Sequence, residues 1–285
     1  MTQIKIVTDS TALLTAAEVA DLDINIVPLS VMIDDHSYQD TVTISRDEFV
    51  EKMATAKTLP KTSTPAIGTF TDVYERLLAE SPETQIISIH LTVGLSGTFD
   101  AARQAAAIVD DKRITVIDST FIDRSLAFQV LQAAKMAQAG DYSVAQIVNA
   151  IKATAAKTHL YLTVASLDNL VAGGRISRAT GFIGGLLQIK IGAHVVAGEI
   201  LVESKGRGGK ATKAYLQHII EQMQAAPNGI AMIGIAHVAI PKEAAAFEAQ
   251  LQSIFPDAQI LVGQTSPTVS THTGVGAFGI SYLEN

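Results

Sequence analysis

The sequence predicts an α/β protein of two domains, the first built around a mostly parallel sheet and the second around a mixed or antiparallel sheet. Three observations support this. The length of 285 residues exceeds that of a usual single domain, β-branched runs alternate with helical patterns in the first half, and this rhythm changes after about residue 160. We place the domains at residues 1–159 and 160–285. Proline and glycine clusters are too short for long linkers, so we expect the domains to pack closely around a cleft.

Four short aliphatic and β-branched runs predict the strands of the first sheet: Ile4–Val7, Ile24–Leu29, Ile86–Leu91 and Ile114–Ile117. Helical patterns separate several of these runs, as is typical of βαβ units. Capping boxes predict three helix starts, formed by Thr15 with Glu18, Ser45 with Glu48, and Ser143 with Gln146. Thr64 is predicted to cap a further helix that has Pro65 at its first position.

The second half predicts a different order of elements. A strand is expected over Leu160–Val164, followed by a hairpin in which Ala197-Gly198 joins Ala193–Val196 to Glu199–Ser204. Helices and strands then alternate again, with helices near Lys213–Gln224 and Lys242–Ile254 and strands near Ile230–Ala236 and Gln259–Val262. These elements make up the predicted second domain.

The composition excludes several classes of protein. Hydrophobic residues make up 48% of the chain and charged residues 17%, which is too apolar for a disordered chain. The absence of cysteine excludes disulfides, thiolate catalysis and thiolate metal sites, and the net charge of −7 argues against nucleic-acid binding. No run approaches the ~18 apolar residues of a membrane-spanning helix, and no secretory signal is recognised. We expect a cytoplasmic protein without stable membrane insertion, compatible with transient membrane contact.

Positive charge gathers in one segment of this acidic chain. Between Arg175 and Lys213 there are seven basic residues against two acidic ones. Such a segment is a candidate docking surface for an acidic partner face. Its basic residues are Arg175, Arg178, Lys190, Lys205, Arg207, Lys210 and Lys213.

Polar clusters follow three predicted strands of the first half: Thr8–Ser10, Thr92–Thr98 and Asp118–Thr120. Open α/β sheets bind their ligands at the carboxyl ends of parallel strands. Ordinary caps between strand and helix explain Asp9 and Asp118 equally well. The glycines of the Thr92–Thr98 loop favour ligand binding, because they allow backbone N–H groups to approach a ligand beside the start of the next helix.

Two further clusters suit an anion. Lys61–Pro65 carries three adjacent hydroxyl side chains at a predicted helix start, and capping needs only one of them. Thr62 and Ser63 are therefore left over for a carboxylate or phosphate. Ser270–Gly276 places His272 among hydroxyls and glycines instead of on an apolar helix face, which favours a functional role for this histidine. No cluster predicts a metal site.

Three motif matches fail on their context. Gly274–Gly279 matches the dinucleotide fingerprint G-x-G-x-x-G, but too few residues follow for the helix and acidic residue of such a site. Gly94–Thr98 begins like the hydrolase motif G-x-S-x-G, but Thr98 stands in place of the last glycine. Gly206–Ala211 lacks the spacing and the hydroxyl residue of a phosphate-binding loop. We therefore expect no ATP site on this chain.

The order and spacing of the clusters resemble the DegV-like family of bacterial fatty-acid-binding proteins over nearly the whole chain. The matching segments are Thr8–Ser10, Thr62–Pro65, Gly94–Phe99, Val116–Ser119, Leu167–Leu170, Gly173–Ser177, Leu186–Lys190 and His272–Gly276. This resemblance implies two α/β domains, the first with a Rossmann-like sheet. It also implies one long-chain fatty acid such as palmitate, bound in a tunnel between the domains as ligand, with no cofactor.

The resemblance also implies roles for particular residues. The carboxylate of the fatty acid is expected to be held by the loops that contain Thr62, Ser63, Ser96 and Gly97, together with His272. The sequence departs from the family pattern at two places: Ile191 stands where the family usually has proline, and Phe121–Ser125 replaces a stretch of small residues.

The better-understood members of the family hand their fatty acid to a separate kinase subunit, related to dihydroxyacetone kinases, which phosphorylates the carboxylate with ATP. The resemblance thus implies that this chain is not an enzyme but the lipid-binding subunit of a fatty-acid kinase. It implicates the region of Arg175 in docking, and the charge pattern adds Arg207 and Lys210 to the expected docking surface.

Two alternatives stay open. The first is an acyl hydrolase with Ser96 as nucleophile, His272 as base and Asp9 or Asp118 as the orienting acid. The second is a regulatory protein whose lipid is only structural. Acyl chain length, saturation and oligomeric state do not follow from the sequence.

Overall fold

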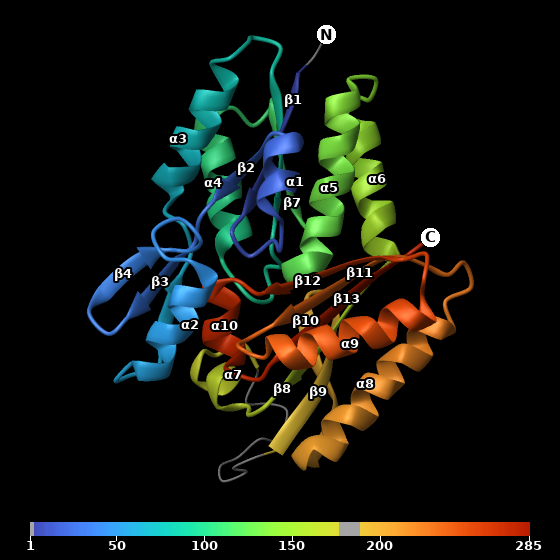
Figure 1. The fold of residues 1–285 in the computed structure, drawn as a ribbon. Coiled ribbons are helices and arrows are strands. Elements are labelled where there is room, and N and C mark those ends of the chain that lie inside the picture. Colours follow the sequence, from blue (N-terminus) through green and yellow to red (C-terminus); the bar gives the residue numbers. More distant parts are fainter. Residues whose placement is uncertain (1–2, 177–188) are drawn as a thin grey trace.

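The computed structural model describes residues 3–176 and 189–285, which form three β-sheets covered by helices (Figure 1). The strands of the first sheet come from residues 4–118, and those of the largest sheet come from residues 158–284. In Figure 1 the first sheet stands in the upper half of the molecule and the largest sheet crosses the lower half. Arg178 and the segment Leu186–Gln188, both singled out in the sequence, lie outside the described residues.

The first sheet is parallel throughout, with the strand order β2-β1-β6-β7. Its strands are β1 (Ile4–Asp9), β2 (Ile24–Val27), β6 (Gln85–His90) and β7 (Ile114–Asp118). Helices cover both of its faces, α3 (Ile67–Leu78) and α4 (Thr98–Val109) on one side and α1 (Ala16–Asp21), α5 (Asp123–Ala139) and α6 (Val144–Ala156) on the other. Burial of both faces explains the continuous aliphatic runs of these strands. The prediction of a parallel first sheet is confirmed.

The largest sheet is mixed, as predicted, with the order β10-β9-β8-β13-β11-β12. Only the β11–β12 pair is parallel among its described strands. The strands are β8 (Thr158–Val164), β9 (Ile189–Val196), β10 (Glu199–Arg207), β11 (Ile230–His237), β12 (Gln259–Gln264) and β13 (Phe278–Glu284). Helices α8 (Gly208–Gln224) and α9 (Pro241–Ile254) cover one face. Helix α5 packs on the other face, where a Cβ at Gly234 would overlap the side chain of Arg124, so α5 lies between the two sheets.

The predicted β9–β10 hairpin is confirmed and brings the two halves of the chain into contact. Its turn residues, Ala197 (φ 49°) and Gly198 (φ 84°), both adopt positive φ, as the tight hairpin turn requires. The turn packs against the loop after β6, where Thr92 Oγ1 donates to the carbonyl of Gly198 at 3.3 Å. A Cβ at Gly198 would overlap Thr92, so glycine is needed for this approach as well as for the turn.

A third, small sheet was not predicted. Its order is β4-β3-β5, with β3 (Ser30–Ile33), β4 (His36–Gln39) and β5 (Lys61–Ser63), and helix α2 (Arg46–Thr55) packs beside it. The prediction that Thr64 caps a helix is therefore wrong. The residues before Thr64 pair with β3 as an edge strand, so the helix starts three residues later, at Ile67, with Ala66 as an N-cap that provides no side-chain hydrogen bond.

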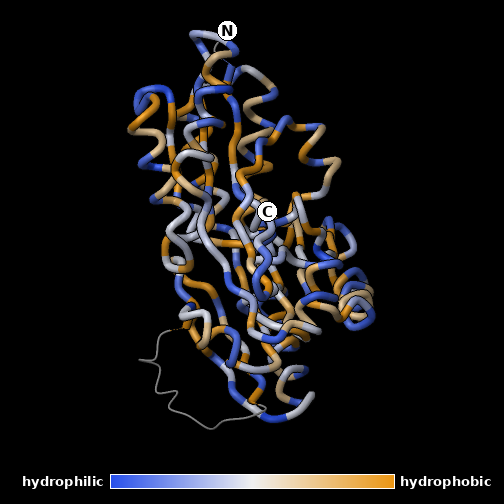
Figure 2. Tube along the Cα trace, turned by 90° about the vertical axis from the view of Figure 1, so that its left-hand side faces the viewer, coloured by the Kyte–Doolittle hydropathy of each residue, from blue (hydrophilic) through white to orange (hydrophobic). Residues whose placement is uncertain are grey.

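The other predicted helix starts agree with the structure. Thr15 and Ser143 form reciprocal capping boxes, whereas Ser45 accepts from the backbone of Glu48 without the return bond. Two short helices, α7 (Asp168–Ala172) and α10 (Pro267–Thr273), pack against each other. Apolar stretches run along the strands in the middle of the molecule (Figure 2). Within residues 3–176 and 189–285, we find no helix with the length and apolar character needed to cross a bilayer.

Candidate functional site

A cavity with mainly aliphatic walls lies where the three sheets meet. Its lining comes from the small sheet, from the loop after β6, from the start of α5, from α10 and from five strands of the largest sheet. Aliphatic side chains of the wall include Leu29, Leu91, Leu160, Leu162, Val195 and Val238. Concave apolar sites with a few converging polar groups are the usual binding sites for small molecules.

Four of the predicted ligand-binding residues line this cavity: Thr62, Ser63, Ser96 and His272. The fifth, Gly97, is the N-cap residue of α4 and is not among the lining residues. It nevertheless brings two of the predicted loops together, because a Cβ at Gly97 would lie 3.6 Å from Thr64 Cγ2. The structure thus gathers the predicted clusters at one place, while their roles in binding stay predictions.

We call Thr62, Ser63, Ser96 and His272 the polar group of the cavity. Thr62 and His272 form its central contact. Thr62 Oγ1 lies 2.8 Å from His272 Nε2, although 210 residues separate them in the chain. The other ring nitrogen, Nδ1, is buried and has no hydrogen-bond partner among the described residues. It faces Gly173, where a Cβ would overlap it, so only glycine leaves room for the ring.

This geometry favours one tautomer of His272. A buried N–H group without an acceptor is rarer in proteins than an unsatisfied acceptor, so the hydrogen belongs on Nε2. Nε2–H then donates to Thr62 Oγ1, and the hydroxyl hydrogen of Thr62 stays free for another acceptor. Burial, and to a smaller extent the charge of Arg175, lowers the pKa of His272 from 6.5 to about 4. The ring is therefore neutral near pH 7.

Ser96 is held in place by the first turn of α4. Its Oγ accepts from the backbone N–H of Thr98 at 3.3 Å and lies 2.9 Å from Thr98 Oγ1. When the buried Thr98 hydroxyl donates, the hydrogen of Ser96 is free to point into the cavity. Ser96 and Thr62 can thus both act as donors to an anion.

Arg175, predicted as a docking residue, lines the cavity and also a second, outer cavity. Its guanidinium donates to the carbonyls of Leu95 (3.1 Å) and Gly173 (2.5 Å), and burial lowers its pKa. The outer cavity shares Thr62 and His272 with the apolar one and is also lined by Lys61, whose side chain is exposed. The polar group therefore separates an apolar cavity from an outer one that has two cations. The sequence analysis did not predict that Arg175 lines the cavities. The adjacent glycines at 173 and 174, which allow close packing, were the one sequence feature that indicated it.

The other docking residues lie farther along the largest sheet. Arg207 ends β10 and Lys210 lies in the first turn of α8, and both are exposed. Ile191, at the position where the family usually has proline, lies inside β9 and pairs with Lys205 on one side and Val164 on the other. Isoleucine keeps the backbone N–H that a proline would remove from this sheet.

The triad of the hydrolase alternative is not assembled. His272 Nε2 contacts Thr62 instead of Ser96, and the hydrogen bonds of Asp9 and Asp118 go to other residues. Asp118 accepts from the backbone of Thr120 at 2.8 Å, which is a turn within its own loop. Asp9 is used inside the first sheet, as described next.

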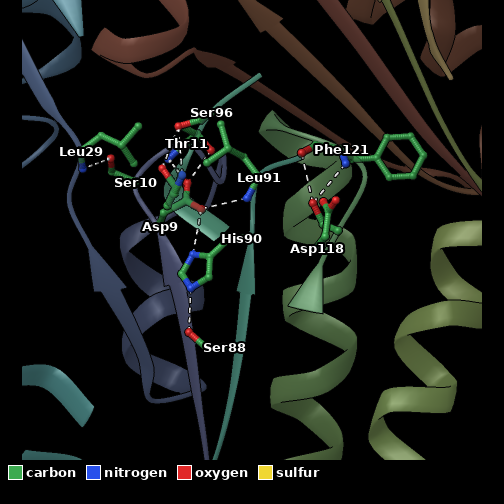
Figure 3. Close-up of polar contacts among 12 residues, drawn as sticks. Asp9, Ser10, Thr11, Leu29, Ser88, His90, Leu91, Ser96, Asp118 and Phe121 are labelled. Carbon is green, nitrogen blue, oxygen red and sulfur yellow. Dashed lines mark hydrogen bonds and ion pairs between the residues drawn. The ribbon is translucent and has the colours of Figure 1, made fainter. Parts of the chain in front are cut away.

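Asp9 ends a buried hydrogen-bonded chain that the sequence did not reveal (Figure 3). Tyr74 Oη donates to Ser88 Oγ at 2.8 Å, Ser88 Oγ lies 2.7 Å from His90 Nε2, and His90 Nδ1 lies 3.1 Å from Asp9 Oδ2. Because the hydroxyl of Tyr74 donates to Ser88, Ser88 is left to donate to His90, and His90 donates to the carboxylate. The serine, histidine and aspartate are all fully buried, and none of them lines the cavity.

Groups of three or more His, Asp or Glu side chains suited to a metal ion are not found in residues 3–176 and 189–285. The residues that gather at the cavity are hydroxyls, one imidazole and one guanidinium. Such a set suits the binding of an organic anion.

Comparisons with known proteins identify the family and the fold of the chain. The model of the DegV family matches residues 3–285. A DegV domain-containing protein of Listeria innocua is 44% identical over 282 residues, which is 99% of either chain. Among solved structures, DegV of Bacillus subtilis, a fatty-acid-binding protein, superimposes with a TM-score of 0.91 at 29% identity over the whole of both chains. A stearic-acid-binding protein of Eubacterium ventriosum gives a TM-score of 0.88 at 26% identity, over 99% of this chain and 98% of that one. The chain belongs to the DegV family.

Proposed function

We propose that this chain binds one long-chain fatty acid, with the acyl chain in the apolar cavity and the carboxylate at Thr62, Ser63, Ser96 and His272. The observation that carries the proposal is a largely aliphatic cavity that meets two hydroxyls with free hydrogens at its polar group. The related proteins of Bacillus subtilis and Eubacterium ventriosum, which are described as binding fatty acids, support the same ligand class.

The energetics of such a site favour a long acyl chain. Each buried methylene contributes ~0.8 kcal/mol, so a chain of palmitate length offers on the order of 10 kcal/mol before ordering and association reduce it. The polar group then has only to donate enough hydrogen bonds to offset the desolvation of the carboxylate. Hydrogen bonds from neutral hydroxyls meet that requirement.

In this proposal His272 acts through Thr62. Its Nε2–H fixes the oxygen of Thr62, and the hydroxyl hydrogen is thereby directed to the carboxylate. Because the pKa of His272 is lowered to about 4, the ring stays neutral and does not form an ion pair that would hold the carboxylate back. One carboxylate oxygen stays available to react.

We further propose that the chain presents this carboxylate to a separate kinase of the dihydroxyacetone-kinase type, which forms an acyl phosphate with ATP. The outer cavity supports this step, because it borders the same polar group and carries Lys61 and Arg175, two cations suited to a phosphoryl group. Arg175, Arg207 and Lys210 are the proposed contacts to an acidic face of the kinase. The fatty acid is the ligand and, in this proposal, no further cofactor is needed.

The ligand is tested by mass spectrometry of protein purified from lipid-replete cells. Native spectra should show the mass of one long-chain fatty acid per chain, and denaturing extraction should release and identify it. Spectra with only the mass of the free chain would contradict the proposal.

The carboxylate site is tested with Ser96→Ala. Its fatty-acid affinity should fall by about tenfold or more, since a hydrogen bond to a charged group is removed, while the unfolding transition stays in place. The same samples are incubated with p-nitrophenyl esters. Steady hydrolysis by the unaltered chain that Ser96→Ala abolishes would instead favour the hydrolase alternative.

The kinase step is tested by reconstitution. Acyl phosphate should form only when the chain, the kinase, ATP and Mg²⁺ are all present. The double variant Arg207→Ala/Lys210→Ala should keep its fatty acid and lose binding to the kinase. Lys135→Ala/Lys152→Ala serves as the control, because it removes the same charge at two exposed lysines of helices α5 and α6. Equal kinase binding by both double variants would contradict the docking surface, and acyl phosphate formed without the kinase would contradict the division of labour.

A further inference from the structure

One carboxyl group interrupts the apolar wall of the cavity. Asp123, at the start of α5, lines the cavity beside Ile122 and lies close to Ala236 and Gly279. It makes no hydrogen bond with Thr62, Ser96 or His272, and its partners come from a different part of the chain. Asp123 is therefore a second polar position in the cavity, distinct from the group proposed to hold the carboxylate.

The two oxygens of Asp123 differ. Oδ2 accepts from Thr265 Oγ1 at 2.8 Å, whereas Oδ1 is buried and has no hydrogen-bond partner among the described residues. The side chain is only 4% exposed, so this oxygen is not satisfied from the surface. The backbone of Asp123 has φ 60°, a conformation that orients the side chain at the junction between loop and helix.

The cations near Asp123 do not satisfy the free oxygen. The guanidinium of Arg124 donates to Glu18 and to the carbonyl of Leu13, and that of Arg46 donates to the carbonyl of Gln264. Both guanidinium groups act on Asp123 through their charge, and the backbone N–H of Arg124 also favours its ionised form. Burial outweighs these effects and raises the pKa of the carboxyl to about 6. An unsatisfied buried carboxylate oxygen is destabilising unless something else donates to it.

An unsubstituted hydrocarbon chain offers no such donor. A hydroxyl group on the acyl chain does, because its O–H can donate to Oδ1 while the carbon atoms on either side contact the aliphatic wall. The small residues Ala236 and Gly279 lie on the Oδ2 side of the carboxyl, where a Cβ at Gly279 would be in ordinary van der Waals contact with Oδ2 at 3.7 Å.

We propose that the cavity selects fatty acids that carry a hydroxyl group within the acyl chain, with that hydroxyl donating to Asp123 Oδ1. This inference rests on the proposed fatty-acid site and names the substrate class that fits it. A site that hydrogen-bonds a ligand hydroxyl discriminates strongly against the ligand that lacks it, because the protein group is then left unpaired.

The experiment measures affinities of the full chain, freed of lipid, for stearate and for a series of monohydroxystearates that differ in hydroxyl position. One hydroxystearate isomer should bind about tenfold more tightly than stearate. Isomers whose hydroxyl lies nearer to or farther from the carboxylate should show a smaller preference. Asp123→Gly, chosen because glycine readily adopts φ 60°, should bind stearate and the favoured isomer equally. Ser96→Ala should weaken both ligands by the same factor and keep their ratio.

Each result decides between the two proposals. If all hydroxystearates bind no better than stearate, Asp123 does not recognise a ligand hydroxyl and the inference is overturned, while the fatty-acid site stands. If neither stearate nor any isomer binds the unaltered chain, the fatty-acid site itself is wrong. The positional preference of the unaltered chain is informative even if Asp123→Gly does not fold.

Discussion

His90 and His272 each place Nε2 against a hydroxyl group, yet the two regions around them are built for different purposes. Around His90 every ring nitrogen has a partner, and Tyr74, Ser88 and Asp9 complete a chain of hydrogen bonds inside the first sheet. Around His272 one ring nitrogen has no partner in the part of the chain that the structure describes, and the ring lines two cavities. The His90 region, in which every ring nitrogen has a partner, is the one with the Ser–His–Asp order of a hydrolase.

The difference shows that residue types and spacing do not by themselves make a reactive site. Ser88 already interacts with Tyr74 and His90 and lies at 0% exposure, so no substrate can approach it. Thr62 and Ser96 have hydrogens left to donate and border a cavity. A ligand site needs both unsatisfied groups and space, and the His272 region meets both conditions.

The strongest way to separate the two regions is to remove each histidine. His90→Ala removes the acceptor of the Ser88 hydroxyl and one of the two donors to Asp9 Oδ2, and it leaves a cavity in the core, so we expect the free energy of unfolding to fall by roughly 3 kcal/mol. His272→Ala should change it far less, because among the described residues its ring has a single hydrogen-bond partner, Thr62, to lose. Urea denaturation checks both. Equal losses in the two variants would show that the His272 region is also structural.

A smaller effect is expected for Thr62→Val, which removes one hydroxyl without changing the size of the side chain. Fatty-acid affinity should fall by about 1.5–3 kcal/mol, the contribution of a hydrogen bond to a charged group, with little change in stability. Competition binding with stearate measures it. Thr55→Val, an exposed threonine of α2, is the matched control and should bind like the unaltered chain. Unchanged affinity for Thr62→Val would place the carboxylate elsewhere.

Gly173→Ala tests the fit of the His272 ring by steric means. A Cβ there would overlap Nδ1, so the ring must move and its contact with Thr62 must change, and we expect a loss of affinity of about 1–2 kcal/mol. Gly68→Ala in α3, where nothing lies within 4 Å of the added Cβ, is the control. Wild-type affinity in Gly173→Ala would mean that the ring position does not matter for binding.

The last expected effect concerns the pH dependence of stability, and it is absent near pH 7, where His272 is neutral in the folded chain. Burial lowers the pKa of His272 from 6.5 to about 4, so between these values the unfolded chain binds more protons there than the folded chain. His272 therefore makes stability rise as pH increases from about 4 to 6.5, and His272→Gln should reduce that slope. Asp40 and Asp123 act in the opposite sense, since burial raises each pKa from 3.8 to about 6.

Urea denaturation at several pH values between 4.5 and 7.5 measures this slope. His36→Gln, an exposed histidine beside Tyr38, serves as the control and should follow the unaltered chain. A steeper slope in His272→Gln would contradict the lowered pKa of His272.

Much of the fold could be predicted from the sequence because it depends on neighbours in the chain. The aliphatic runs at Ile4–Val7 and Ile86–Leu91 predict parallel strands, since both faces of that sheet are covered. The capping boxes at Thr15 and Ser143 and the turn at Ala197-Gly198 are local signals as well, and the structure confirms each of them. The small sheet was missed because its strands have only three or four residues and are partly polar.

The site was predictable as a set of clusters but not as a geometry. Three features of the site depend on how the three sheets pack. Thr62 contacts His272 across 210 residues, Arg175 lines both cavities, and Asp9 is hydrogen-bonded to His90 inside the first sheet. The sequence by itself determined many of the strands and helices of the two larger sheets and which family the chain resembles, because local patterns encode them. Only the tertiary structure decided which polar groups find partners and which stay free at a cavity, because burial and hydrogen-bond satisfaction are set by residues distant in the chain.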